Sequence, residues 1–140
     1  VPLAALLAVV FAFKPSWLDR FGWGLVVLSA VAALGAILAA GSGEALEETV
    51  KESRALEDHV EMGDAAQVVA IVFFCVVLAV VVARFFARRN SAAEGVWAFI
   101  SSKGGAMVIA VALVLSASAA TYTIVEAGHQ GAKATWETKP

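Results

Sequence analysis

Long apolar stretches alternate with shorter polar segments along the chain. The apolar stretches cover residues 1–13, 21–41, 65–83 and 104–125. The last three have the length of roughly 20 residues that a helix needs to cross about 30 Å of hydrocarbon. The pattern therefore predicts an all-α integral membrane protein, with one transmembrane domain over residues 1–140.

The first apolar stretch is shorter than the others. Its 13 residues would reach only about 20 Å as a helix, so we expect the inner part of a span that is truncated at its N-terminal end. A cleaved signal peptide is the alternative, but no basic segment precedes Lys14, and such a peptide would carry one. Short connections favour antiparallel neighbours, which predicts a four-helix up-and-down bundle.

Small residues indicate where helices pack closely in lipid. They form rows in two of the spans, namely Ser29, Ala32, Ala33, Gly35, Ala36 and Ala39 in residues 21–41, and Ala112, Ser116 and Ala120 in residues 104–125. Residues 65–83 are bulky instead. We therefore expect that span to present much of its surface to lipid or to another subunit.

Composition supports a membrane location. Hydrophobic residues make up 61% of the chain and charged residues 16%, and the mean hydropathy is +0.84, whereas soluble domains average about 45–50% apolar and about 25% charged residues. The formal net charge of -2 argues against a nucleic-acid-binding surface. The single cysteine, Cys75, lies in an apolar stretch, where we expect it to pack.

The charge of the polar segments predicts the orientation. Residues 42–64 hold eight of the twelve acidic residues and two basic ones, whereas residues 84–103 hold four basic residues. Because Lys and Arg favour the cytoplasmic side, we expect a basic inner loop at 84–103 and an acidic outer loop at 42–64. The C-terminus then lies outside, and both histidines, His59 and His129, lie at the same membrane face.

His59 and Gly63 are candidate cofactor-binding residues. They are one helical turn apart and share a helix face, and the glycine would let a flat ring approach the backbone. The alternative is an ordinary histidine at the membrane edge, with Gly63 only loosening the loop. His129 lies between Gly128 and Gly131, which indicates either a bent backbone or a helix end followed by a solvated side chain.

The two histidines together could ligate haem b or contribute to a metal site. Glu44 and Glu47 belong to a stripe of acids at helical spacing, which is typical of a solvated face. They could instead join the histidines around zinc, manganese or iron. The sequence contains no HExxH, CxxC, GxSxG or phosphate-loop motif, so an enzyme is the less favoured class.

The segments SGEALEETV, LEDHVEMGD and GHQGAKATW resemble a family of small four-helix bacterial membrane proteins of unknown function that is common in actinobacteria. The family is loosely grouped with b-type membrane cytochromes. The resemblance implies a multi-pass protein of the bacterial inner membrane. It also implies haem ligation, with His59 as the first candidate ligand and His129 as the second. It also implies further histidines upstream of the segment that matches residues 1–10.

The residues and the resemblance together leave three functional hypotheses. The first is an accessory or electron-transfer component of a membrane complex, for example a respiratory one, which binds haem b near the outer face. The second is a cofactor-free structural subunit, and the third is a membrane protein that binds metal through glutamate and histidine. The expected partners are the lipid bilayer and either other membrane subunits or further copies of the chain, and not nucleic acid.

Overall fold

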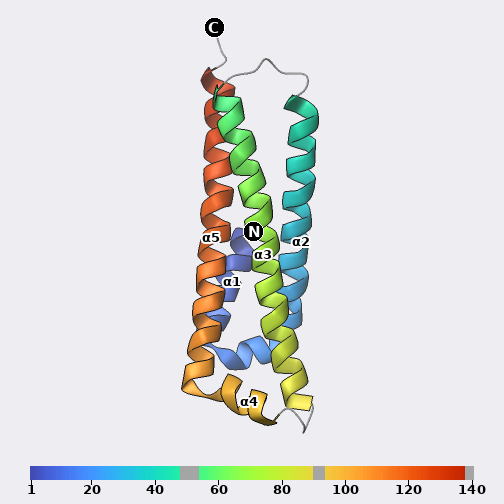
Figure 1. The fold of residues 1–140 in the computed structure, drawn as a ribbon, viewed down its shortest axis with the longest axis vertical. Helices are drawn as coiled ribbons and strands as arrows, with labels where there is room; N and C mark the ends of the chain where they lie inside the picture. The colour runs from blue at the N-terminus through green and yellow to red at the C-terminus, as the bar shows by residue number, and fades with distance from the viewer. Residues whose placement is uncertain (48–53, 90–93, 138–140) are drawn as a thin grey trace.

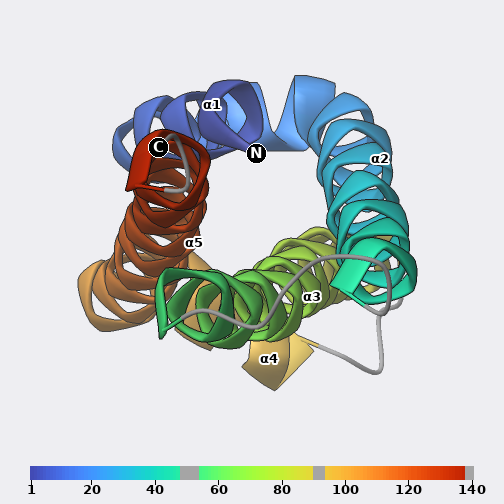
Figure 2. The same ribbon diagram turned by 90° about the horizontal axis from the view of Figure 1, so that it is seen from above.

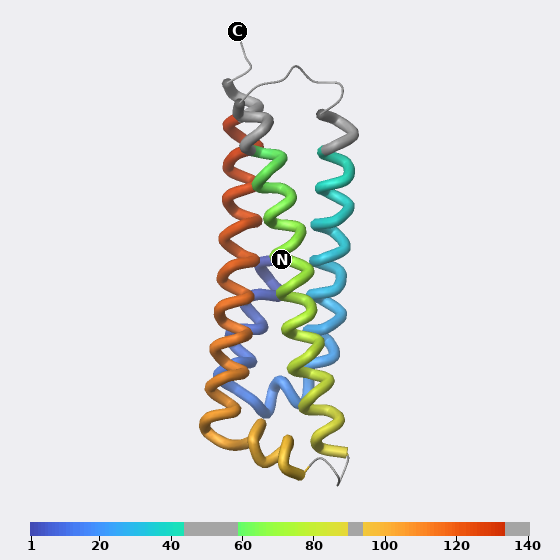
Figure 3. Tube along the Cα trace, viewed as in Figure 1, coloured from blue at the N-terminus to red at the C-terminus, as the bar shows by residue number. Residues whose placement is uncertain are grey.

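The computed structural model describes residues 1–47, 54–89 and 94–137, with side chains for residues 1–43, 59–89 and 94–133 (Figure 3). These residues form five helices. They are α1 (Pro2–Phe13), α2 (Pro15–Glu47), α3 (Arg54–Arg89), α4 (Glu94–Ser101) and α5 (Lys103–Glu137). The all-α prediction is confirmed, but four helices were expected and the described residues contain a fifth, α4.

Four of the helices surround a common axis, in the order α1, α2, α3, α5 (Figure 2). The helices α2, α3 and α5 run the length of the molecule, whereas α1 runs beside only part of them and α4 lies across one end (Figure 1). We call this end the basic end. It contains the turn from α1 to α2, the last turn of α3, and the whole of α4. The opposite end, where α2 and α5 finish and α3 starts, is the acidic end.

Three helices are long and apolar enough to cross a membrane. The apolar parts lie within residues Pro15–Gly43, His59–Arg89 and Lys103–Lys133. The helix α1 has 12 residues, or about 18 Å at the usual rise. The sequence therefore predicted the three long spans correctly, and the first stretch is a short apolar helix.

The long helices extend well beyond the predicted spans. With 33, 36 and 35 residues in α2, α3 and α5, each is about 50 Å long, compared with about 30 Å of hydrocarbon. The expected loop at 42–64 is thus helical over Ser42–Glu47 and Arg54–Asp64. The expected loop at 84–103 contains the end of α3 and all of α4. The connections between the spans therefore contain helix over these residues.

Several glycines near the ends of the long helices do not interrupt them. Gly41 and Gly43 lie inside α2, and Gly128 and Gly131 lie inside α5. No glycine in the described residues has a positive φ. Because these segments are otherwise rich in Ala and Glu, which favour helix, single glycines cost too little to end them.

The bulky third span leaves much of its surface exposed, as at Val68, Val72 and Phe86, and it also forms part of the core. In α3 a buried row recurs every three or four residues and includes Ala66, Ala70, Phe73, Val77 and Val81. The helix packs between α2 and α5, and more of its apolar window is buried, 28%, than in the windows of α2, 22%, or α5, 17%.

The small residues follow the prediction in part. Ser29, Ala33 and Ala120 are buried, whereas Gly35 and Ala39 are exposed. Large apolar side chains cover the outside of the bundle, among them Val27, Leu34, Leu38, Val111 and Leu115. Because lipid tails are as apolar as these side chains, such a surface is stable only inside a membrane.

Candidate functional site

His59 lies at the acidic end, on the first turns of α3, and it contacts α5. Its Nδ1 atom is 3.1 Å from the carbonyl oxygen of Ala127, and the residue is half-buried. A carbonyl oxygen only accepts hydrogen bonds, so Nδ1 carries the proton in the neutral ring. This assignment leaves Nε2 with the lone pair that a metal or haem iron needs.

Gly131 of α5 makes room for the His59 ring. A Cβ atom on Gly131 would lie 2.8 Å from Cε1 of His59 and 3.2 Å from Nδ1. A Cβ atom on Gly63 would have no heavy atom of the described residues within 4 Å. The contact between His59 and Gly131 joins α3 to α5, and the role of Gly63 beside a flat cofactor stays a prediction.

His129 lies at the same end as His59, yet the structure does not bring the two side chains together. His59 contacts Ala127 and packs on Gly131, and His129 lies two residues from each. Two residues correspond to about 200° around a helix, so His129 points away from His59. Its side chain is exposed.

Glu44 and Glu47 lie in the last turn of α2, and their side chains are outside the described residues. The predicted metal site therefore stays a prediction. Within the described residues, no group of three or more His, Cys, Asp or Glu side chains could hold a metal ion.

The basic end contains an ion pair that the sequence reasoning missed. Arg84 of α3 donates from Nε to one carboxylate oxygen of Asp19 at 2.8 Å and from Nη2 to the other at 3.0 Å. Arg88 Nη1 lies 3.4 Å from the second oxygen. The side chains of Arg84 and Asp19 are only 8% and 19% exposed, so this bidentate contact is shielded from water.

A signal for this pair existed in the sequence. Arg84 is flanked by apolar residues on both sides, and a charge in such a place needs a partner. The segments predicted on its side of the membrane, 14–20 and 84–103, contain only two acids, Asp19 and Glu94. The requirement for a partner of opposite charge therefore leaves those two carboxylates as candidates for pairing with Arg84.

Aromatic rings surround the arginines of the basic end. The guanidinium carbons of Arg84 and Arg88 lie 5.8 and 5.7 Å from the ring centre of Trp97 in α4. Arg89 lies 4.3 Å from the ring centre of Phe85. The two cation–π contacts with Trp97 join α4 to the end of α3, whereas the contact between Arg89 and Phe85 lies within α3.

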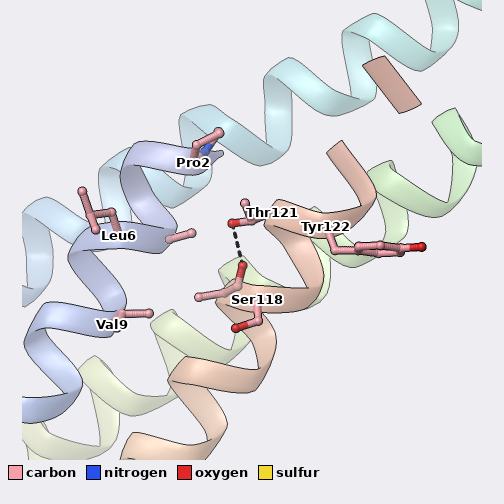
Figure 4. A pocket seen from close by; sticks show the side chains of 8 residues that line it. Pro2, Leu6, Val9, Ser118, Thr121 and Tyr122 are labelled. Carbon is pink, nitrogen blue, oxygen red and sulfur yellow. Dashed lines mark hydrogen bonds between the residues drawn. The ribbon is translucent and has the colours of Figure 1, made fainter. Parts of the chain in front are cut away.

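A pocket of about 570 Å³ opens between α1 and α5 within the apolar part of the bundle. Figure 4 shows Pro2, Leu6 and Val9 on one side and Ser118 and Thr121 on the other, with the ring of Tyr122 directed away. The Thr121 hydroxyl donates to the carbonyl oxygen of Ala117 at 2.9 Å. The proton of that hydroxyl is therefore used in a hydrogen bond within α5.

The long apolar helices, their lipid-compatible surface and the charged groups at both ends define a multi-pass membrane protein. A family model described as "Predicted membrane protein (DUF2231)" matches residues 1–139. The chain belongs to this family, as the resemblance to an uncharacterised membrane family predicted. Neither the curated proteins nor the solved structures include a match to the chain.

Proposed function

We propose that this membrane protein binds haem b at the acidic end, with His59 as an axial ligand, and acts as an accessory or electron-transfer component of a membrane complex. The observation that carries the proposal is the 3.1 Å contact between His59 Nδ1 and the Ala127 carbonyl oxygen. Histidines that ligate metals commonly donate their other ring N–H to a carbonyl or carboxylate, which fixes the tautomer and the ring orientation.

Contacts with α5 fix the position of the His59 ring, whose Nε2 would hold the haem iron. The hydrogen bond to Ala127 and the close approach to Gly131 both hold the ring of His59 against α5. A ring held in this way loses little freedom when Nε2 takes a ligand. Haem b bound there would supply one-electron exchange, with its potential set by the axial ligands and by burial.

The geometry makes the two histidines unequal. His59 is held by α5, whereas His129 is exposed and directed away from it. Of the two histidines, His59 would therefore hold the haem iron, and His129 of the same chain would not.

The first experiment is a reduced-minus-oxidised visible spectrum of the protein purified gently from its native membrane. We expect a sharp α-band and a shifted Soret peak. A flat spectrum after haem-replete expression would contradict the proposal and favour the cofactor-free subunit. Crosslinking in native membranes would then identify the partners, and metal analysis would test the site at Glu44 and Glu47.

Variants then test the assignment to His59. We expect His59→Ala to abolish the α-band and His129→Ala to retain it, with unchanged helical circular dichroism in both, because the spans depend on helix packing. An α-band that survives in His59→Ala and disappears in His129→Ala would show that the ligand is misassigned.

A matched pair of glycine variants tests the support of the ring. Gly131→Ala places a Cβ atom 2.8 Å from Cε1 of His59, whereas Gly128→Ala meets no described heavy atom within 4 Å. Gly131→Ala should displace the ring from Ala127 and lower haem occupancy severalfold. Equal occupancy in the two variants would show that the contact with Gly131 does not support the ligand.

A further inference from the structure

A pocket of about 410 Å³ lies at the basic end between α2 and α3. Its lining combines two kinds of residue: the charged Asp19, Arg84, Arg88 and Arg89, and the apolar Leu18, Trp23, Val81 and Phe85. No part of this pocket takes part in the proposed haem site, which is at the other end of the bundle.

The charged part of the pocket has more cations than its own anion can neutralise. Three guanidinium groups face one carboxylate, and both oxygens of Asp19 already contact arginines, at 2.8 and 3.0 Å to Arg84 and 3.4 Å to Arg88. A guanidinium has five N–H donors. Arg88, with a side chain 49% exposed, and the exposed Arg89 therefore retain donors for an external anion.

The apolar part of the pocket is formed by residues next to the membrane spans. Trp23 contacts Phe85 edge to face, with ring centres 5.7 Å apart, and Val81 lies one turn further into the span. Tryptophan favours the headgroup level of a bilayer. A ligand that matches this lining carries an anionic phosphate joined to an apolar body.

We propose that this pocket binds an anionic glycerophospholipid, with its phosphate at Arg88 and Arg89 and its glycerol and first acyl carbons against Trp23 and Phe85. Basic pockets between transmembrane helices bind the headgroups of anionic lipids. The Asp19–Arg84 pair positions the site, because it fixes α2 against α3 next to Arg88 and Arg89. Free inorganic phosphate shares the charge of the headgroup but would leave the apolar lining unused.

The test is native mass spectrometry of the full chain in a neutral detergent, in which no charged lipid surface contributes. Phosphatidylglycerol and phosphatidylcholine with identical acyl chains are titrated separately. We expect the first bound molecule of phosphatidylglycerol to bind at least about tenfold more tightly than the first bound molecule of phosphatidylcholine. The reason is that only phosphatidylglycerol has a net negative charge. Equal binding of the two lipids would overturn the proposal. So would displacement of phosphatidylglycerol by equimolar inorganic phosphate.

A pair of double variants locates the site. Arg88→Gln with Arg89→Gln removes two charges from the pocket, and Lys14→Gln with Arg20→Gln removes two exposed charges that stack on Trp17 and Phe21 outside it. The first pair should weaken phosphatidylglycerol binding about tenfold and the second less than twofold. Equal losses would show a general charge effect and overturn the proposal. If the first pair fails to fold, Arg89→Gln alone should still weaken binding about threefold, and unchanged binding would overturn it.

Discussion

Arg84 holds a permanent charge where water scarcely reaches, since only 8% of its side chain is exposed. The cost of burying that charge is offset by Asp19, which accepts two hydrogen bonds from it. Removing one partner of such a pair is much more harmful than replacing both with apolar residues, because the remaining charge stays buried and unpaired.

Asp19→Asn should therefore destabilise the protein by about 2–4 kcal/mol. The matched control is Arg88→Gln, because Arg88 is half-exposed and lies 3.4 Å from the same carboxylate; its loss should cost less than about 1 kcal/mol. Denaturation in mixed micelles, followed by circular dichroism, measures both. Equal losses of stability would mean that the bidentate contact with Arg84 is not the main one.

At the residue scale, the sequence makes His59 a candidate ligand but does not indicate which residues contact it. Gly131 lies 72 positions further along the chain, and the pattern around His59 contains nothing that selects it over the nearer Gly63. Only the packing of α3 on α5 makes Gly131 the neighbour of the ring. Asp19 and Arg84 were missed for the same reason, because each was considered within its own segment.

At the scale of elements, the junction between α4 and α5 is a tight turn with one residue, Ser102, between the two helices. The Ser102 hydroxyl donates to the carbonyl oxygen of Phe99 at 2.7 Å and accepts from the backbone N–H of Gly105 at 3.1 Å. A Cβ atom on Gly105 would overlap the carbonyl group of Phe99. Because that obstacle is backbone, it cannot move aside as a flexible side chain would.

Gly105→Ala should therefore displace α4 and destabilise the protein by about 1–3 kcal/mol. Gly104→Ala is the control, since its Cβ atom would meet only Ser102 Oγ, at 3.8 Å, and alanine favours helix. The midpoint of thermal unfolding in detergent measures stability, and hydrogen exchange of α4 measures its docking. Unaltered exchange in Gly105→Ala would contradict the argument.

The long elements were predictable and their ends were not. Runs of about 20 apolar residues identify α2, α3 and α5 because the hydrocarbon thickness sets that length. Outside the hydrocarbon, the helix continues wherever propensity and packing permit, and acidic segments rich in Ala and Glu permit it. The short α4 lies in a segment assigned to a loop because its eight residues are too few for a clear periodicity.

At the scale of the whole molecule, charge differs between the two ends. Segments 14–20 and 84–103 together hold six basic residues, two and four, and both lie at the basic end (Figure 1). The positive-inside rule therefore predicts that the basic end faces the cytoplasm and the acidic end faces outward.

Cysteine labelling in intact cells tests this orientation. A membrane-impermeant maleimide should label Ser42→Cys directly and Ser16→Cys only after permeabilisation, since both serines are exposed at opposite ends. The native Cys75 serves as an internal control, because it lies in the apolar part of α3 and faces outward from the bundle into lipid. The reverse pattern of labelling would invert the assigned orientation.

The pairing of Asp19 with Arg84 also has a consequence for biosynthesis. The two residues are 65 positions apart, so a nascent chain carries the carboxylate of α2 well before the guanidinium of α3 exists. Insertion of α2 alone leaves an uncompensated anion at the membrane boundary, and insertion of α3 neutralises it. The carboxylate of α2 is therefore paired only once α3 is also in place.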